Sequence, residues 1–230
     1  MAHDIPPFNY CDYRCRRCDR VSKCSLYQKE KVSRLQHVLK GENPDDMEVV
    51  MGDVQASLIE AASMIERMAR EQGVDLSASS DMEDEHRAAR KEMENHPLYR
   101  QAYEFMDRCG AFLEECEKRL PMTPEIQEFF DEIAWNRTLI PAKAARAIVQ
   151  AGSQCEYGRD DSHRTARLIA SCLSNCLRAY DQILFYRPQS EEMVRPLKEM
   201  VKEMLKQWES FSAGQDRGWC GAKELKTPSA

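Results

Sequence analysis

Apolar residues recur at steps of three and four along most of this 230-residue chain, and that spacing constrains its fold more than any other feature. An α-helix has 3.6 residues per turn, so such steps place apolar side chains along one helix face. No run of four to eight residues alternates apolar and polar side chains as a half-buried strand would. Because the connections between the periodic segments are short, the sequence predicts an all-α fold, an up-and-down bundle of four to five main helices.

Capping and breaking residues predict where several helices begin and end. Asn43 is a predicted N-cap for a long amphipathic helix that Gly73 ends. Pro141 lies inside a later helical pattern and is expected to kink or split that helix. Asp161 or Ser162 is expected to cap the helix that follows.

Composition and charge predict three parts of the chain. Residues 1–40 form a cysteine-rich, metal-binding head with a first helix, residues 41–212 form the helical bundle, and residues 213–230 form a flexible, Gly-rich polar tail. The head holds nine Lys and Arg against four acids, a net charge of +5, while the rest of the chain holds 24 bases against 35 acids, a net charge of −11. A basic head thus precedes an acidic body.

Four of the ten cysteines fall within fourteen residues near the N-terminus, with the spacing C-x3-C-x2-C-x5-C. Closely spaced thiolates repel one another unless a cation gathers them, and metal binding lowers the thiol pKa enough to make the thiolates. The alternative is four unrelated thiols in a loop, and the density of the group argues against it. The sequence therefore predicts a metal centre held by Cys11, Cys15, Cys18 and Cys24.

The spacing favours an iron–sulfur cluster over zinc. A structural zinc site usually draws its ligands from two separated C-x2-C-like pairs, so that two chain segments enclose one small ion. Here all four ligands come from one short segment, as in the closely spaced cysteine loops of bacterial ferredoxins. We expect a [4Fe-4S] cluster, with zinc as the alternative.

The stretch from Cys15 to Tyr27, CRRCDRVSKCSLY, resembles the C-x2-C-x5-C loop of WhiB-like iron–sulfur regulators, in which a helix follows the last cysteine. The resemblance covers about a dozen residues and implies cluster ligation by Cys15, Cys18 and Cys24. It departs from that family at Cys11, which lies only four residues before the loop, and the long body has no counterpart there. It supports a cluster rather than a role in transcription.

A second spacing, C-x3-C-x2-C from Cys11 to Cys18, matches that of radical S-adenosylmethionine enzymes. Those enzymes leave one iron open, favour an aromatic residue before the third cysteine and are built on a β/α barrel. This chain has Arg17 at that place, a fourth cysteine at Cys24 and no predicted strands, so fold context argues against the match.

Basic residues between the cysteines have two interpretations. Four thiolates around zinc or an oxidised four-iron cluster leave a net charge near −2, which neighbouring Arg and Lys side chains offset. A nucleic-acid surface would also be basic, but the acidic body would repel phosphates. We therefore expect another protein as the partner, rather than nucleic acid or a membrane.

The remaining polar and cysteine pairs carry weaker signals. Glu83 with His86 and Asp160 with His163 have the E-x-x-H-like spacing of di-iron bundles, but their polar surroundings predict solvated side chains. A cationic group after Pro141 could hold an anion inside the bundle, although a surface position is commoner. Four further cysteines share helix faces in pairs and are expected to be buried as small apolar groups: Cys109, Cys116, Cys172 and Cys176.

No nucleophile, phosphate-binding loop or catalytic triad is visible, which leaves enzymatic activity uncertain. The sequence also shows no apolar run long enough for a membrane helix and no secretory leader, so we expect a cytoplasmic protein with reduced thiols. The predicted function is metal binding, with a cluster that senses oxidants or relays electrons. The alternative is a zinc-stabilised helical protein that serves as an interaction module.

Overall fold

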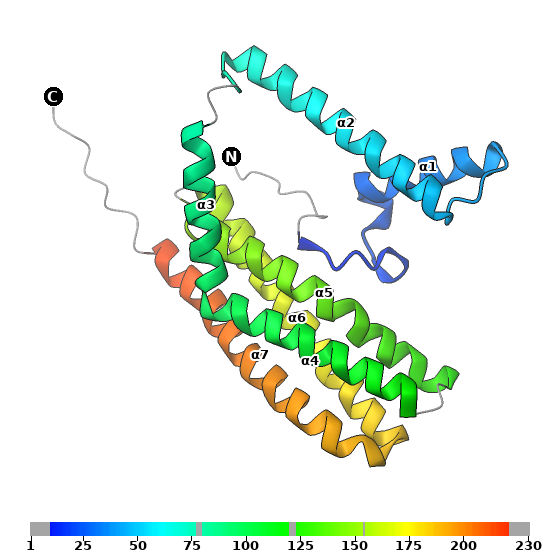
Figure 1. The fold of residues 1–230 in the computed structure, drawn as a ribbon. Helices are drawn as coiled ribbons and strands as arrows, with labels where there is room; N and C mark the ends of the chain where they lie inside the picture. Colours follow the sequence, from blue (N-terminus) through cyan, green and yellow to red (C-terminus); the bar gives the residue numbers. More distant parts are fainter. Residues whose placement is uncertain (1–9, 77–79, 120–122, 154, 221–230) are drawn as a thin grey trace. The chain divides into compact units, whose positions relative to one another are not determined.

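All regular secondary structure in the described residues is helical, which confirms the all-α prediction. The structure is a computed structural model that describes residues 10–76, 80–119, 123–153 and 155–220. Seven α-helices in these ranges exceed the four to five main helices expected, because helices also form before the bundle (Figure 1). Their bounds are α1 Ser25–Leu39, α2 Met47–Gln72, α3 Ser80–Asn95, α4 Pro97–Arg119, α5 Pro124–Ala151, α6 Glu156–Tyr186 and α7 Glu191–Cys220.

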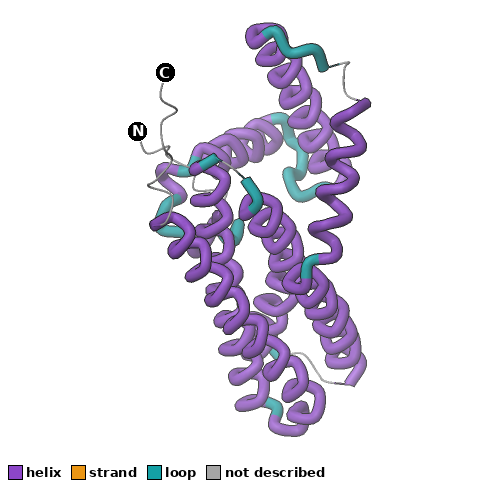
Figure 2. Tube along the Cα trace, turned by 90° about the vertical axis from the view of Figure 1, so that its left-hand side faces the viewer, coloured by secondary structure: helices purple, strands orange, loops and turns teal. Residues whose placement is uncertain are grey.

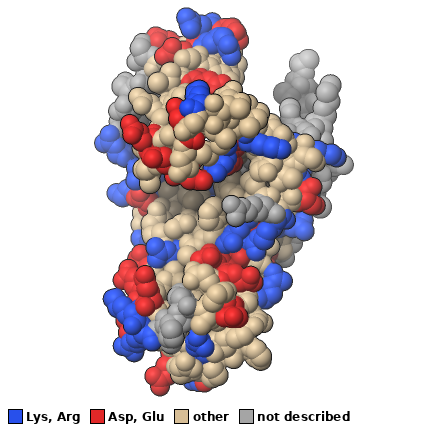
Figure 3. Space-filling view, turned by 90° about the vertical axis from the view of Figure 1, so that its right-hand side faces the viewer, with Lys and Arg blue, Asp and Glu red and all other residues tan. Residues whose placement is uncertain are grey.

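The chain divides into two compact units, which we describe separately. One comprises residues 13–88, and the other comprises residues 1–12 with residues 89–230. None of the described helices is both long and apolar enough to cross a membrane. On the face drawn in Figure 3, acidic and basic side chains are interspersed and do not form one field of a single sign.

Helices α4 to α7 form a four-helix bundle. α5 and α6 each contact the helices before and after them, and α7 returns to contact α4, so the four helices close into a ring. They run side by side in both ribbon views (Figures 1 and 2). The apolar faces of the four helices, which on α4 include Ala102, Phe105, Cys109 and Phe112, meet inside this ring. Its largest fully buried side chains include Phe105, Phe130, Leu173, Tyr180, Met204 and Trp208.

Helix α5 continues through Pro141, so the expected split is wrong. Proline removes one backbone hydrogen bond and costs about 3 kcal/mol in a helix interior. Pro141 is buried, and so are Ile140 and Ala144 beside it. Burial of these neighbours in the bundle core keeps the helix continuous despite that cost.

The structure corrects two predicted helix starts. α6 begins at Glu156 with Cys155 as N-cap, because the carboxylate of Asp161 pairs with another helix and the Ser162 hydroxyl donates to the Ala147 carbonyl at 2.7 Å. α2 begins at Met47 with Asp46 as N-cap, whose side chain accepts from the Glu48 N–H. Asn43 instead accepts from the Asp45 N–H in the preceding turn. Gly73 ends α2 with a left-handed backbone, φ +68°, as predicted.

In the other unit, α1 and α2 form an antiparallel hairpin joined by polar contacts. Lys29 near the start of α1 pairs with Glu60 at 2.6 Å, and Ser33 one turn later donates to Asp53 at 2.7 Å. α1 contains no buried residue, and Ala69 is the single buried residue of α2. The hairpin therefore leaves most of its apolar side chains exposed.

Candidate metal segment and polar clusters

The four-cysteine segment folds as two short 3-10 turns, η2 at Cys15–Arg17 and η3 at Val21–Lys23. The N–H of Cys18 donates to the Cys15 carbonyl at 3.2 Å, and the N–H of Cys24 donates to the Val21 carbonyl at 3.3 Å. Each of these two cysteines thus closes a turn, and Cys24 is also the N-cap residue of α1. All four cysteine residues of the segment are partly buried.

Two backbone features of the segment are typical of functional loops. The N–H of Arg20 points at the Cys18 sulfur at 3.4 Å, and a backbone hydrogen bond of this kind stabilises the thiolate form of a ligand. Tyr13, between the first two cysteines, has a left-handed backbone with φ 58°. A residue with a Cβ rarely adopts that conformation, which costs about 1 kcal/mol or more and concentrates at binding sites.

The four cysteines are shared between the two units of the chain. The boundary between the two units falls between Asp12 and Tyr13, so Cys11 belongs to one unit and the other three cysteines to the second. No three His, Cys, Asp or Glu side chains of the described residues are grouped closely enough to hold a metal ion. The donor chemistry of four thiols fits an iron–sulfur cluster or zinc.

Residues on either side of Cys11 are anchored to the bundle. The indole Nε1 of Trp135 on α5 donates to the Asp12 carbonyl at 2.8 Å. The Arg164 guanidinium on α6 lies 5.2 Å from the centre of the Tyr10 ring, within cation–π range. Cys11 therefore lies between two attached neighbours, an arrangement that no pattern in the sequence predicted.

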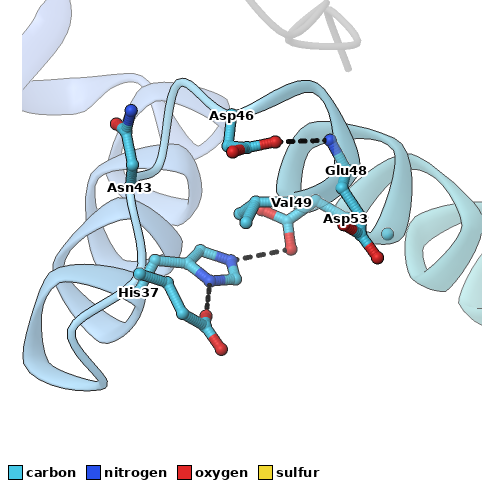
Figure 4. Close-up of a pocket in the computed structure, with 8 residues that line it drawn as sticks. His37, Asn43, Asp46, Glu48, Val49 and Asp53 are labelled. Atoms are coloured by element: carbon cyan, nitrogen blue, oxygen red, sulfur yellow. Dashed lines mark hydrogen bonds and ion pairs between the residues drawn. The ribbon is translucent and has the colours of Figure 1, made fainter.

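A charged network surrounds His37, in the last turn of α1 (Figure 4). Its Nδ1 lies 2.5 Å from a Glu42 carboxylate oxygen, and its Nε2 lies 3.0 Å from an Asp53 oxygen. The hydrogen bonds to Glu42 and then Asp53 raise the pKa of His37, while those from Ser33 and His37 lower the pKa of Asp53. An open pocket here is lined by residues of both helices and the loop. Sequence analysis missed it because the pocket depends on how the chain turns between α1 and α2.

The scattered cysteines of the bundle are buried, which confirms the expectation for Cys109, Cys116, Cys172 and Cys176. The Cys109 sulfur lies 3.1 Å from the Tyr180 hydroxyl. Burial raises the pKa of Cys109 to about 12 and that of Cys116 to about 11. These thiols therefore stay protonated near neutral pH, where a metal ligand or nucleophile would need the thiolate.

Asp160 and His163, the E-x-x-H-like pair whose side chains are described, do not form a ligand set. Asp160 pairs with Arg164 one turn along α6, and His163 Nδ1 lies 3.3 Å from Ser212 of α7. The side chains of Glu83 and His86 lie outside the residues whose side chains are described. In the cationic group after Pro141, Arg146 pairs with Asp161.

Comparison with known proteins gives no relative for this chain: no family model matches it, and neither a curated protein nor a solved structure does.

Proposed function

We propose that the chain binds a [4Fe-4S] cluster through Cys11, Cys15, Cys18 and Cys24 and uses it to sense oxidants or to relay electrons to a partner protein. One observation carries the proposal: four thiols occupy fourteen residues, and they outnumber the two carboxylates of that segment, Asp12 and Asp19. The 3-10 turns and the left-handed Tyr13 keep the segment folded back on itself rather than extended. A reducing compartment, the cytoplasm, suits such a centre.

The residues between the cysteines set the electrostatics of the proposed site. A bound cluster would supply one-electron transfer. Five basic residues lie within the segment and offset the negative charge of four thiolates: Arg14, Arg16, Arg17, Arg20 and Lys23. The Arg20 N–H holds the Cys18 sulfur in place, and hydrogen bonds and positive charge near cluster sulfurs both raise a reduction potential.

Structural zinc is the second candidate. Cys15 and Cys18 span one 3-10 turn with C-x2-C spacing, the commonest ligand pair of zinc modules. In that case the metal would fold the head, and the helices would bind a protein partner without redox chemistry.

Anaerobic purification of the full chain distinguishes the two metals. A cluster gives brown protein with about four iron and four sulfide per chain, whereas structural zinc gives colourless protein with about one zinc. Cys15→Ser and Cys24→Ser should each lose most of the metal. Cys155→Ser is the matched control, because Cys155 is exposed, lies outside the segment and caps α6, where serine is a good N-cap.

Protein free of both iron and zinc would overturn the proposal. It would also fail if Cys155→Ser lost metal as completely as Cys15→Ser did, since the metal would then not be specific to the segment.

A further inference from the structure

Helix α2 carries an apolar row with the spacing of a coiled coil. Seven of its residues follow one another at alternating steps of four and three, and we call them the α2 seam: Met47, Met51, Val54, Leu58, Ala61, Ile65 and Met68. An unbroken repeat of this kind over three heptads keeps one row of side chains facing a partner helix as the two helices supercoil. The seam is thus built for helix pairing.

Among the described residues of its own unit, no helix covers the seam. α1 contacts α2 through Asp53 and Glu60, which are seven residues apart and form a separate row about 100° around the helix. The six large side chains of the seam remain between 46% and 73% exposed. Two more exposed apolar residues, Val50 and Met64, flank it.

The exposed area matches what a dimer requires. An unfolded chain exposes about 1.45 Å² per dalton, so a large aliphatic residue at half exposure presents about 90 Å². The eight large residues of the seam and its flanks therefore present about 700 Å², close to the roughly 800 Å² that each partner buries in a standard interface. Patches of this size usually mark an interaction site.

The charges beside the seam select a second copy of the same helix. In a coiled coil the two positions that flank the seam face the partner, and on α2 these positions carry only two charges, Glu48 and Glu71, at opposite ends. In an antiparallel pair Glu48 lies beside Ala69 of the second copy, and Glu71 lies beside Val50. A parallel pair also sets no like charges against each other. A partner helix with charged flanks would find no complement here.

We infer that two copies of this chain associate through the α2 seam. Leu58 lies at its centre, so two copies place their Leu58 side chains in the middle of one apolar interface. The adjacent Ile59 is equally apolar and 60% exposed, but it lies off the seam.

Sedimentation equilibrium of the full chain at tens of micromolar tests the inference, with circular dichroism to check helix content. The wild type should sediment at twice the chain mass of 26.6 kDa. Leu58→Glu should sediment at the single-chain mass, because it places a charge in the interface, and Ile59→Glu should remain dimeric. Ala61→Glu, a second seam variant, covers the case in which Leu58→Glu loses helix.

A monomeric wild type would overturn the inference. So would a dimer that both seam variants leave intact, or one that Ile59→Glu dissociates as fully as they do. None of these outcomes depends on metal content, so the experiment tests the dimer independently of the proposed cluster.

Discussion

The guanidinium of Arg146 donates two hydrogen bonds to the carboxylate of Asp161, from Nε at 2.8 Å and from Nη2 at 3.0 Å. The pair joins α5 to α6, and the Asp161 side chain is almost completely buried while that of Arg146 is about one-third exposed. A two-point contact of this kind fixes both the distance and the rotation between the helices. Loss of the Asp161 carboxylate removes this acceptor from the Arg146 guanidinium.

Asp161→Ala is expected to lower the free energy of unfolding by about 3 kcal/mol, because it removes the two charge-assisted hydrogen bonds that the buried carboxylate accepts from Arg146. Urea denaturation measures the change. The neighbouring substitution Asp160→Ala removes an exposed pair with Arg164 and should cost less than about 1 kcal/mol. Equal effects of the two substitutions would show that the Arg146 pair adds nothing beyond a surface contact.

Gly158→Ala is expected to destabilise the bundle by about 1–3 kcal/mol. A Cβ at Gly158 would overlap the Ser153 side chain and lie 2.8 Å from the Gln150 Oε1 atom, so the first turn of α6 must shift. Thermal unfolding by circular dichroism should show a lower midpoint. Gly52→Ala in α2 is the control, because its added Cβ meets nothing within 4 Å, and the bundle transition should stay where it is.

The stability of the α1–α2 hairpin should depend on pH through His37. The pKa of His37 is raised above the ordinary 6.5. The stabilisation of the folded hairpin by protonated His37 is therefore complete below pH 6.5 and is lost as pH rises through the folded pKa. The pKa of Asp53 is lowered below 3.8, so its contribution is complete above pH 3.8 and is lost as pH falls through its folded pKa. The contacts between α1 and α2 are therefore strongest from about pH 4 to pH 6.5.

An NMR titration of the imidazole signals checks the direction of the His37 pKa shift. His37 should titrate above 6.5, and His96, whose pKa burial lowers, should titrate below 6.5 in the same sample. Asp53→Asn should move His37 back toward 6.5. The reverse order of the two histidines would contradict the network around His37.

Cysteine alkylation should follow burial. Hydrogen bonds from Ser153 and then from the Gly158 N–H lower the pKa of the exposed Cys155, while burial raises the pKa of Cys109 and Cys176. Brief treatment of folded protein with iodoacetamide at pH 8 should label Cys155 and leave the other two unlabelled until denaturant is added. Peptide mass spectrometry measures the order, and early labelling of Cys109 would show that the core opens readily.

The sequence predicts the bundle well because its signals are local. The period of apolar residues and the left-handed Gly73 depend on neighbours within a few turns. The start of α6 was missed because the Asp161 carboxylate, a good cap in isolation, is held by Arg146, fifteen residues away. Pro141 does not split α5 for a related reason, since burial of its neighbours outweighs the local cost of proline.

The candidate site also has features that the sequence predicted and features that it did not. Spacing alone identified the four cysteines as a group, but it carried no information on Trp135, whose hydrogen bond to Asp12 spans 123 residues. The network of His37, Glu42 and Asp53 also depends on how the hairpin turns. Contacts of this range require the fold, which composition and periodicity do not supply.

The return of α7 to α4 has a consequence for how the protein is made. α4 emerges from the ribosome early, yet the helix that closes its side of the ring follows only after α5 and α6. Until then apolar side chains of α4 such as Phe105 have incomplete cover, and nascent chains in that condition attract chaperones. Completion of the bundle is thus delayed until α7 has been synthesised, and chains terminated before α7 should be recognised as unfinished.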